Sequence, residues 1–280
     1  VAQTLFYALY TLQHRGQESA GISTTADGHI FTHKNTGLVS HVFQENDLES
    51  LVGKLGIGHT RYSTTGSTNN RNSQPLHVKS TKSELALAHN GNIVNVIELK
   101  KELELEGIRF NTTIDSEVIA YLINSYPSED ISEKVKYAMK KIKGAYSLTI
   151  LYKDQIIGVR DPHGVRPLCI GKVENSFVLA SETCALDHVG AEFVREVEPG
   201  EIVVIDKTGL HSFHYDGLTV RPAPCIFEYI YFARPDSVMN GLLNYSVRRK
   251  MGIQLAKKYP VEADVVIGVP DSAIPAAIGY

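Results

Sequence analysis

Ala-Leu-Ala-His-Asn-Gly-Asn, residues 86–92, is the stretch around which the rest of the chain can be arranged. Residues 85–88 form a short apolar run that predicts a buried strand, and this run stops at polar residues placed around a glycine. Asn and Gly tolerate left-handed backbone conformations, so we expect a sharp turn at 89–92. Such a turn can aim a backbone N–H and the Asn90 amide at one point, as an oxyanion hole does, although a plain hairpin turn is the commoner use of Asn-Gly.

Composition excludes several functional classes. The chain has 280 residues, 43% of them hydrophobic, and a net charge of −3. It is long enough for a well-buried core and gives no electrostatic case for binding nucleic acid or a membrane surface. Its apolar runs are far shorter than the ~20 residues of a membrane-spanning helix. The three cysteines, Cys169, Cys184 and Cys225, are widely spaced, which argues against a disulfide framework and favours a reducing, cytoplasmic compartment.

Hydrophobic periodicity predicts helices and strands in an α+β order. Helical spacing of apolar residues predicts helices over residues 3–13, 95–106, 132–143 and from 115 onward. Short or alternating apolar runs predict strands near 20–25, 29–34, 55–58, 145–152, 155–160, 167–171, 176–180 and 201–205. The runs after residue 145 are expected to form one antiparallel sheet. This order indicates a layered α+β domain over residues 1–222.

Local signals add detail within this first domain. Asp27-Gly28 is typical of a hairpin turn. Asn95 is expected to cap the helix over 95–106, with Glu98 in the capping-box position. Residues 63–74 are rich in Ser, Thr, Asn and Gly and nearly free of apolar residues, so we expect a mobile loop that burial does not order.

Residues 223–280 are expected to begin a second domain. Arg221-Pro-Ala-Pro224 marks the boundary, and an amphipathic helix is predicted over 240–258. A buried strand is predicted over 263–267, and a turn at 268–272 leads into another helix. Strand, turn and helix in this order are typical of a parallel α/β sheet, whose ligands lie at the carboxyl ends of its strands.

Two charged residues have the chemistry to hold an amino acid. Arg61 follows a strand, and its planar guanidinium can grip a carboxylate through two contacts, although a solvated surface arginine is the commoner case. Asp115 lies at the start of a predicted helix, where an ordinary N-cap is the alternative. An arginine, an aspartate and an amide-lined turn would together suit a carboxylate, an ammonium group and a carbonyl under attack.

Four segments resemble the glutaminase domain of the class II glutamine amidotransferases: LQHRGQE at 12–18, GHTRY at 58–62, AHNGN at 88–92 and TIDSE at 113–117. Later segments narrow the resemblance to the members that transfer ammonia to 5-phosphoribosyl 1-pyrophosphate. These are RDPHGVRP at 160–167, FEYIYFARPDS at 227–237 and GVPDS at 268–272. The resemblance covers the whole chain. It implies an N-terminal-nucleophile hydrolase fold of α-β-β-α layers, followed by the beginning of a type I phosphoribosyltransferase domain.

The resemblance also implies a reaction and the residues that carry it. Family members hydrolyse glutamine at an N-terminal cysteine whose own α-amino group is the base. The released ammonia displaces pyrophosphate from the second substrate and gives 5-phosphoribosylamine, the first committed step of purine biosynthesis. Arg61 would hold the glutamine α-carboxylate and Asp115 its α-ammonium group. Asn90 and the Gly91 N–H would stabilise the oxyanion.

Further residues and cofactors are implied in the same way. His89 belongs to the substrate-binding set, and Tyr62, at the start of the family's glutamine loop, would help to couple the two sites. Ser272 matches a position at the magnesium–pyrophosphate end of the second substrate. Cys225 matches a ligand of the [4Fe–4S] cluster that some members carry, although a buried structural thiol is the alternative. The intact protein is expected to use Mg²⁺ and to form homodimers or tetramers.

The sequence departs from the family at both ends. It begins with Val1-Ala2-Gln3, beyond the strand that would carry the catalytic cysteine, and none of its cysteines matches that nucleophile. An acidic loop for the ribose and phosphate is also missing. We therefore expect a fragment that lacks the first strand and most of the second domain and has no glutaminase activity by itself. Two alternatives stay open: a sugar-phosphate amidotransferase of the same class, or a non-catalytic glutamine-binding regulatory protein.

Overall fold

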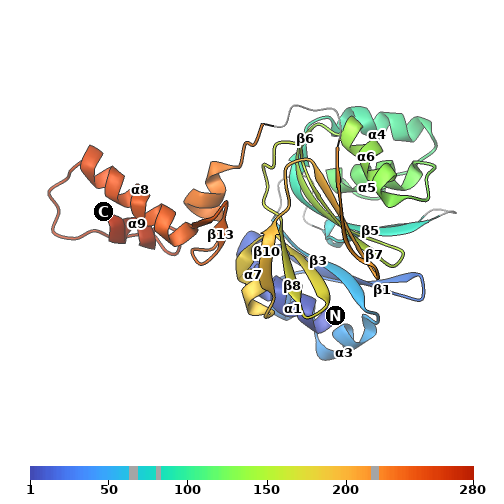
Figure 1. The fold of residues 1–280 in the computed structure, drawn as a ribbon, viewed down its shortest axis with the longest axis horizontal. Coiled ribbons are helices and arrows are strands. Elements are labelled where there is room, and N and C mark those ends of the chain that lie inside the picture. The colour runs from blue at the N-terminus through green and yellow to red at the C-terminus, as the bar shows by residue number, and fades with distance from the viewer. Residues whose placement is uncertain (63–68, 80–82, 216–220) are drawn as a thin grey trace.

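The computed structural model describes residues 1–62, 69–79, 83–215 and 221–280. Most of these residues form stacked layers of sheet and helix, and the segment from residue 226 onward extends to one side (Figure 1). The mixed α and β content agrees with the predicted class. No helix among the described residues is both long and apolar enough to cross a membrane.

The first sheet is antiparallel and has the order β2-β1-β3. Its strands are β1 (Ser19–Ala26), β2 (His29–Thr36) and β3 (Leu55–Arg61). Asp27 and Gly28 both have positive φ angles between β1 and β2, so the predicted hairpin is confirmed. Helix α1 (Ala2–Thr11) packs on this sheet through Leu9, which contacts the cluster around Ile22 and Phe43. Two short helices, α2 (Val39–Val42) and α3 (Glu45–Ser50), complete this side.

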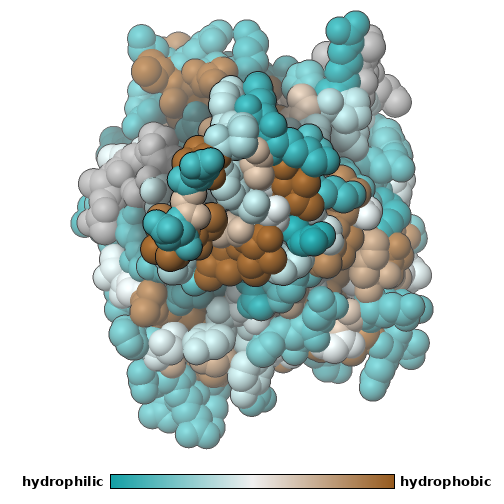
Figure 2. Space-filling model, turned by 90° about the vertical axis from the view of Figure 1, so that its left-hand side faces the viewer, coloured by the Kyte–Doolittle hydropathy of each residue, from teal (hydrophilic) through white to brown (hydrophobic). Residues whose placement is uncertain are grey.

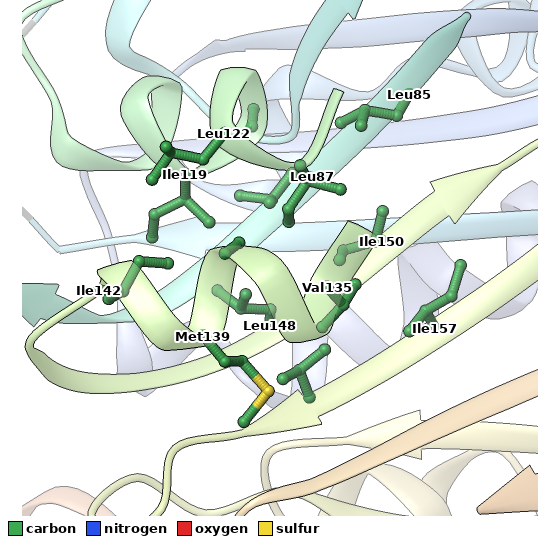
Figure 3. Packing of buried hydrophobic residues seen from close by; sticks show 14 of the residues in the cluster. Leu85, Leu87, Ile119, Leu122, Val135, Met139, Ile142, Leu148, Ile150 and Ile157 are labelled. Atoms are coloured by element: carbon green, nitrogen blue, oxygen red, sulfur yellow. The ribbon is translucent and has the colours of Figure 1, made fainter. Parts of the chain in front are cut away.

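The second sheet has the order β12-β11-β7-β6-β5-β4 and is also antiparallel. Its strands are β4 (Leu76–Lys79), β5 (Glu84–Ile93), β6 (Gly144–Tyr152), β7 (Gln155–Arg160), β11 (Glu201–Asp206) and β12 (Gly209–His214). Three helices cover one face of it: α4 (Val96–Leu105), α5 (Asp115–Ser125) and α6 (Ile131–Lys141) (Figure 1). Leu85 and Leu87 of β5 face these helices, where Figure 3 shows them beside Ile119 and Leu122.

Strand β5 is apolar on both faces because both are covered. Ala86 and Ala88 pack against Ile57 of the first sheet, whereas Leu85 and Leu87 pack against the helices. A strand buried on both sides reads as a continuous apolar run, as residues 85–88 do. The buried stripe predicted for α5 is likewise confirmed, since Val118, Ile119, Leu122 and Ile123 are all at most 1% exposed. The result is the expected order of helix, sheet, sheet and helix.

The strands predicted after residue 145 do not form a single sheet, so that expectation was wrong. β8 (Cys169–Val173) and β9 (Ser176–Ala180) belong to a third sheet, with the order β10-β8-β9 and β10 at Glu192–Glu196. Asp161 explains the separation, because its buried carboxylate accepts the N–H groups of His163 and Val165 and turns the chain away from β7. Helix α7 (Thr183–His188) packs on this sheet.

The sharp turn predicted at 89–92 is also wrong. Strand β5 continues to Ile93, and Asn90, Gly91 and Asn92 lie opposite Ser147, Tyr146 and Ala145 of β6. Glycine is required at 91 by contact: a Cβ there would lie 2.0 Å from the Ala145 carbonyl oxygen. The polar residues 89–92 therefore do not turn the strand; they mark the part of β5 where the side chains stop packing in the apolar core.

Two smaller expectations need correction because polar groups bond to more distant partners. Asn95 is the N-cap residue of α4, as predicted, but its side chain makes no cap hydrogen bond; it donates to the Lys141 carbonyl and accepts from the Lys143 N–H. In the expected loop at 63–74, residues 63–68 lie outside the described chain. Its second part is ordered by polar contacts, with a 3₁₀ turn at Asn70–Asn72 and with Asn72 and Ser73 fully buried.

The C-terminal segment carries helices without the expected strand. Its elements are a π-helical turn η3 (Glu228–Phe232), the short strands β13 (Val238–Met239) and β14 (Leu242–Leu243), and helices α8 (Asn244–Lys258) and α9 (Ile274–Gly279). Residues 263–267 form no strand and are exposed, because among the described residues no neighbouring strand pairs with them. Figure 2 views this side of the molecule and shows apolar side chains gathered on it; Val265, Ile267 and Val269 are among those exposed.

Candidate active site

A cavity of about 200 Å³ opens where the ends of β3 and β5 meet the start of α5. Six of the residues singled out from the sequence line it: Arg61, Tyr62, His89, Asn90, Gly91 and Asp115. They come from three segments that are far apart in the chain. The stacking of the first sheet on the second brings them together.

The edge of β5 presents backbone donors to this cavity. The His89 N–H donates to the Gln74 side-chain oxygen at 2.7 Å, and the Ile93 N–H donates to Asp115 at 3.0 Å. N–H groups alternate between the two edges of a strand, so the Gly91 N–H points to the same edge. Strand β4 pairs with β5 only as far as Leu87 and therefore leaves this part of the edge uncovered.

The Asn90 side chain supplies a second donor. Its neighbours Ala86 and Ala88 show that even-numbered residues of β5 face the first sheet, and Asn90 lines the cavity from that side. Its amide nitrogen is buried and meets no acceptor within the described chain. A buried amide donor without a partner is unfavourable unless a ligand completes it. The pair of donors is therefore suited to a negatively charged oxygen in the cavity.

Asp115 is held as a carboxylate at the first turn of α5. Its Oδ2 accepts the Ile93 N–H, and its Oδ1 lies 3.6 Å from His89 Nδ1, which in turn lies 3.2 Å from the Ser116 hydroxyl. Burial acts to raise the pKa of Asp115, but His89 and the N–H groups of Ile93 and Ser116 outweigh it, so the pKa falls below its usual range. The cavity therefore contains a fixed negative charge at neutral pH.

Arg61 supplies the opposite charge at the end of β3. Its side chain is buried and pairs with the partly buried carboxylate of Glu18. The guanidinium carries five N–H donors in a rigid fork, a geometry that matches a carboxylate through two contacts. Tyr62 follows directly and is exposed at the rim.

His59 lies between these groups as a neutral ring. Burial lowers its pKa to about 3, and only the hydrogen bond to the His89 carbonyl opposes this shift appreciably. Because a carbonyl oxygen can only accept, the Nε2 of His59 must carry the proton that makes this 3.1 Å hydrogen bond. His59 therefore braces the backbone of β5 just before Asn90.

Among the cavity residues that were not singled out from the sequence are Arg15, Arg166 and Phe232. Arg15 and Arg166 lie within the quoted segments 12–18 and 160–167, and Phe232 lies within 227–237. The segments marked these regions, but which side chain faces the cavity depends on the packing of distant parts of the chain.

The remaining candidates lie elsewhere. Ser272 precedes α9 and Cys225 precedes η3, and neither lines the cavity. Within the described residues, no group of three or more His, Cys, Asp or Glu side chains could hold a metal ion. Burial raises the pKa of the Cys184 thiol to about 12 and also raises that of Cys169, and both lie in the third sheet and its helix.

A second cavity, of about 690 Å³, adjoins the first. It lies between β3 and β9, and it shares His59 and Asn90 with the first cavity. β3 pairs only with β1, and β9 only with β8, in the part of the chain that the structure describes. Among the described residues, the unpaired edges of β3 and β9 therefore both border this cavity.

Comparisons with known proteins find similar sequences and similar structures. A family model described as a glutamine amidotransferase domain matches residues 59–188. The amidophosphoribosyltransferases of Methanocaldococcus jannaschii and Archaeoglobus fulgidus are 46% and 49% identical over 100% and 98% of the chain. A solved structure of glutamine phosphoribosylpyrophosphate amidotransferase from B. subtilis, complexed with ADP and GMP, matches 100% of the chain with a TM-score of 0.94 and 45% identity. The chain spans 63% and 60% of the two archaeal relatives and 60% of the B. subtilis chain.

Proposed function

We propose that this chain belongs to the amidophosphoribosyltransferase family, binds L-glutamine in the smaller cavity and forms the part of the enzyme that releases its amide nitrogen. The ammonia would then be transferred to 5-phosphoribosyl 1-pyrophosphate, giving 5-phosphoribosylamine, glutamate and pyrophosphate. One observation supports this proposal. A single cavity is lined by Arg61, Asp115, the Asn90 amide, which meets no acceptor among the described residues, and the uncovered edge of β5 at Gly91.

Each end of glutamine has a matching group in the cavity. Arg61 binds the α-carboxylate through guanidinium N–H groups, and Asp115 accepts hydrogen bonds from the α-ammonium group. The lowered pKa of Asp115 supports this role, because a carboxylate is needed to pair with a cation. A zwitterion carries one charge of each sign, which matches a site that presents the guanidinium of Arg61 and the carboxylate of Asp115.

The side-chain amide of glutamine is placed against the two donors of β5. Attack on its carbonyl carbon makes a tetrahedral intermediate with a negative oxygen, and the Asn90 amide and the Gly91 N–H stabilise that charge. The donors are fixed in advance by the β5–β6 ladder, so no reorganisation is needed as charge develops. Loss of one such donor typically costs about 10²–10³ in rate.

The nucleophile implied by the resemblance is an N-terminal cysteine on a strand. We expect that strand to lie in the cavity between β3 and β9, because an extended segment there would pair with both free edges and join the two sheets. Such a strand would pass His59 and Asn90, which bring it to the oxyanion donors. The three cysteines of the chain lie outside the glutamine cavity.

For the second substrate and the cofactors, the chain offers only single candidate residues. Ser272 offers one hydroxyl next to the carboxylate of Asp271, and Cys225 offers one thiol. Among the described residues neither position has the further ligands that Mg²⁺ or a [4Fe–4S] cluster requires. No step of the proposed chemistry in this chain therefore runs through either group. We place the protein in the cytoplasm as a homo-oligomer, as the resemblance implies.

Calorimetric titration of the chain with L-glutamine tests the proposal. We expect saturable binding of L-glutamine and at least tenfold weaker binding of D-glutamine. The reason is that Arg61, Asp115 and the donors of β5 would each hold a different substituent of the α-carbon. Arg61→Ala should weaken L-glutamine binding by about tenfold or more, the equivalent of about 1.4 kcal/mol. Arg249→Ala, which removes an exposed arginine on α8, is the matched control. Absence of L-glutamine binding, or equal affinity in both variants, would refute the assignment.

A further inference from the structure

One wall of the glutamine cavity comes from the far end of the chain. Phe232, in the π-helical turn η3, lines the cavity together with Arg15 and Arg166. The guanidinium carbons of Arg15 and Arg166 lie 4.6 Å and 5.6 Å from the centre of the Phe232 ring. Two arginines from the amidotransferase layers thus stack on one aromatic ring of the C-terminal segment.

Glu228, at the start of the same turn, holds both arginines. Its carboxylate accepts two hydrogen bonds from Arg15, at 2.9 Å and 3.1 Å, and one from Arg166, at 2.9 Å. The side chain of Glu228 is only 1% exposed. A buried carboxylate shared between two cations fixes the position of each one relative to the other.

The arginines differ in how much of their hydrogen-bonding capacity is used. Arg15 is buried and also pairs with Glu182, so its charge is balanced inside the protein. Burial alone would raise the pKa of Glu182, but His14 and Arg15 lower it to about 2. Arg166 is 26% exposed and pairs through one nitrogen, which leaves N–H groups that can face a ligand in the cavity.

The turn that carries Glu228 and Phe232 is itself fixed from helix α8. Arg248 is 2% exposed, and its guanidinium donates to the carbonyls of Tyr229 and Ala233, each at 2.7 Å. The Ala233 N–H closes the π turn on the Glu228 carbonyl at 3.0 Å. π-Helical turns are rare and are found frequently at functional sites. A continuous set of contacts therefore joins α8 to the cavity.

We infer that Glu228 is a positioning residue of the glutamine site, which sets the guanidinium of Arg166 against the bound amino acid and makes the C-terminal segment part of the pocket. Arg166 is the specificity-determining partner: it presents N–H donors to an oxygen of the ligand. This inference rests on the proposed glutamine binding. It adds a requirement that the residues of the amidotransferase layers alone do not impose.

The test measures L-glutamine affinity of the 280-residue chain by calorimetry. Glu228→Gln removes the charge that holds Arg15 and Arg166, and we expect the dissociation constant to rise by about tenfold or more. Arg166→Met, at a partly exposed position, should weaken binding to a similar extent. The two effects should be less than additive in the double variant, since Glu228 acts partly through Arg166.

The matched control is Glu201→Gln. Glu201 is also 1% exposed and accepts two hydrogen bonds from one arginine, Arg195, at 2.6 Å and 2.8 Å, but it does not line the cavity. Both carboxylate variants should lower the melting temperature, whereas only Glu228→Gln should change the affinity at a temperature where both are folded. Unchanged affinity in Glu228→Gln or in Arg166→Met would overturn the inference while leaving glutamine binding intact. Failure of the unaltered chain to bind glutamine would instead overturn the proposed function, and this inference with it.

Discussion

Gly91→Ala is the substitution whose consequence the structure specifies most sharply. A Cβ on residue 91 would lie 2.0 Å from the Ala145 carbonyl oxygen and 2.7 Å from His89 Nε2. Cβ atoms essentially never approach another heavy atom within 3.0 Å, so β5 and β6 would have to separate by about 1 Å at this point. The contact is with backbone of the central sheet, which side-chain rotation cannot relieve.

The expected loss of stability is large for a single methyl group. Overpacking a well-filled interior costs about 1–3 kcal/mol, and the upper end applies here because the obstacle is a strand of the sheet. We therefore expect Gly91→Ala to reduce the free energy of unfolding by about 3 kcal/mol. A displacement of about 1 Å would also move the two proposed oxyanion donors, and misplacement on that scale can cost about 10²-fold in rate.

Gly107→Ala separates the clash from the backbone effect. Gly107 also has a positive φ, of 89°, but a Cβ on residue 107 would stand in open space, with nothing within 4 Å of it. Only conformational strain remains there, so we expect a loss of about 1 kcal/mol. Urea unfolding of both variants gives the comparison. If Gly91→Ala were no less stable than Gly107→Ala, within about 0.5 kcal/mol, the tight register of β5 against β6 would be refuted.

Two pH effects follow from buried charges. The pKa of Asp115 is lowered in the folded chain, so its charged form stabilises the fold above the unfolded pKa of about 3.9, and this stabilisation is lost as the pH falls through the folded pKa. The difference in unfolding free energy between the chain and Asp115→Asn should therefore shrink on acidification. A constant difference from pH 7 down to pH 3 would contradict this prediction. Burial lowers the pKa of Lys34 to about 8, while its Nζ donates to the carbonyls of Ser73 and Pro75. Between about pH 8 and 10 the unfolded chain therefore holds the Lys34 proton more tightly than the folded chain does. The unfolding free energy of the chain relative to Lys34→Met should rise when it is measured at pH 9.5 in place of pH 7, and a fall would show that Lys34 keeps its ordinary pKa.

Local patterns predicted those elements whose own residues face a core. The hairpin at Asp27-Gly28 needs only residues that accept positive φ, and the stripe of α5 needs only helical spacing. The division of the later strands into two sheets could not be read locally, because it depends on Asp161 collecting N–H groups from the chain that follows. The strand predicted at 263–267 was wrong for a related reason, since an apolar run forms a strand only beside another strand.

The candidate residues were predicted from segments that resemble a family. Periodicity within a single helix or strand could not have placed them in one site. Arg61, Asn90 and Asp115 lie on different elements and meet only through the stacking of two sheets. The ion pairs of Glu228 could not be predicted from the sequence, because its partners, Arg15 and Arg166, are 213 and 62 residues away. Buried ion pairs between distant segments leave no periodic pattern in a sequence.

The polar end of β5 shows why a site can be misread as a turn. Residues 89–92 lose the apolar character of 85–88 at the point where the strand borders the cavity. Their backbone keeps its partners on β6, so the ladder continues while the side chains change from packing to binding. For the fold alone, a glycine forced by contact with Ala145 and an asparagine amide that meets no acceptor among the described residues are both unfavourable. Under the proposed function, a ligand oxygen accepts from the Asn90 amide, and Gly91 lets β5 stay close enough to β6 for the ladder to hold both donors in place.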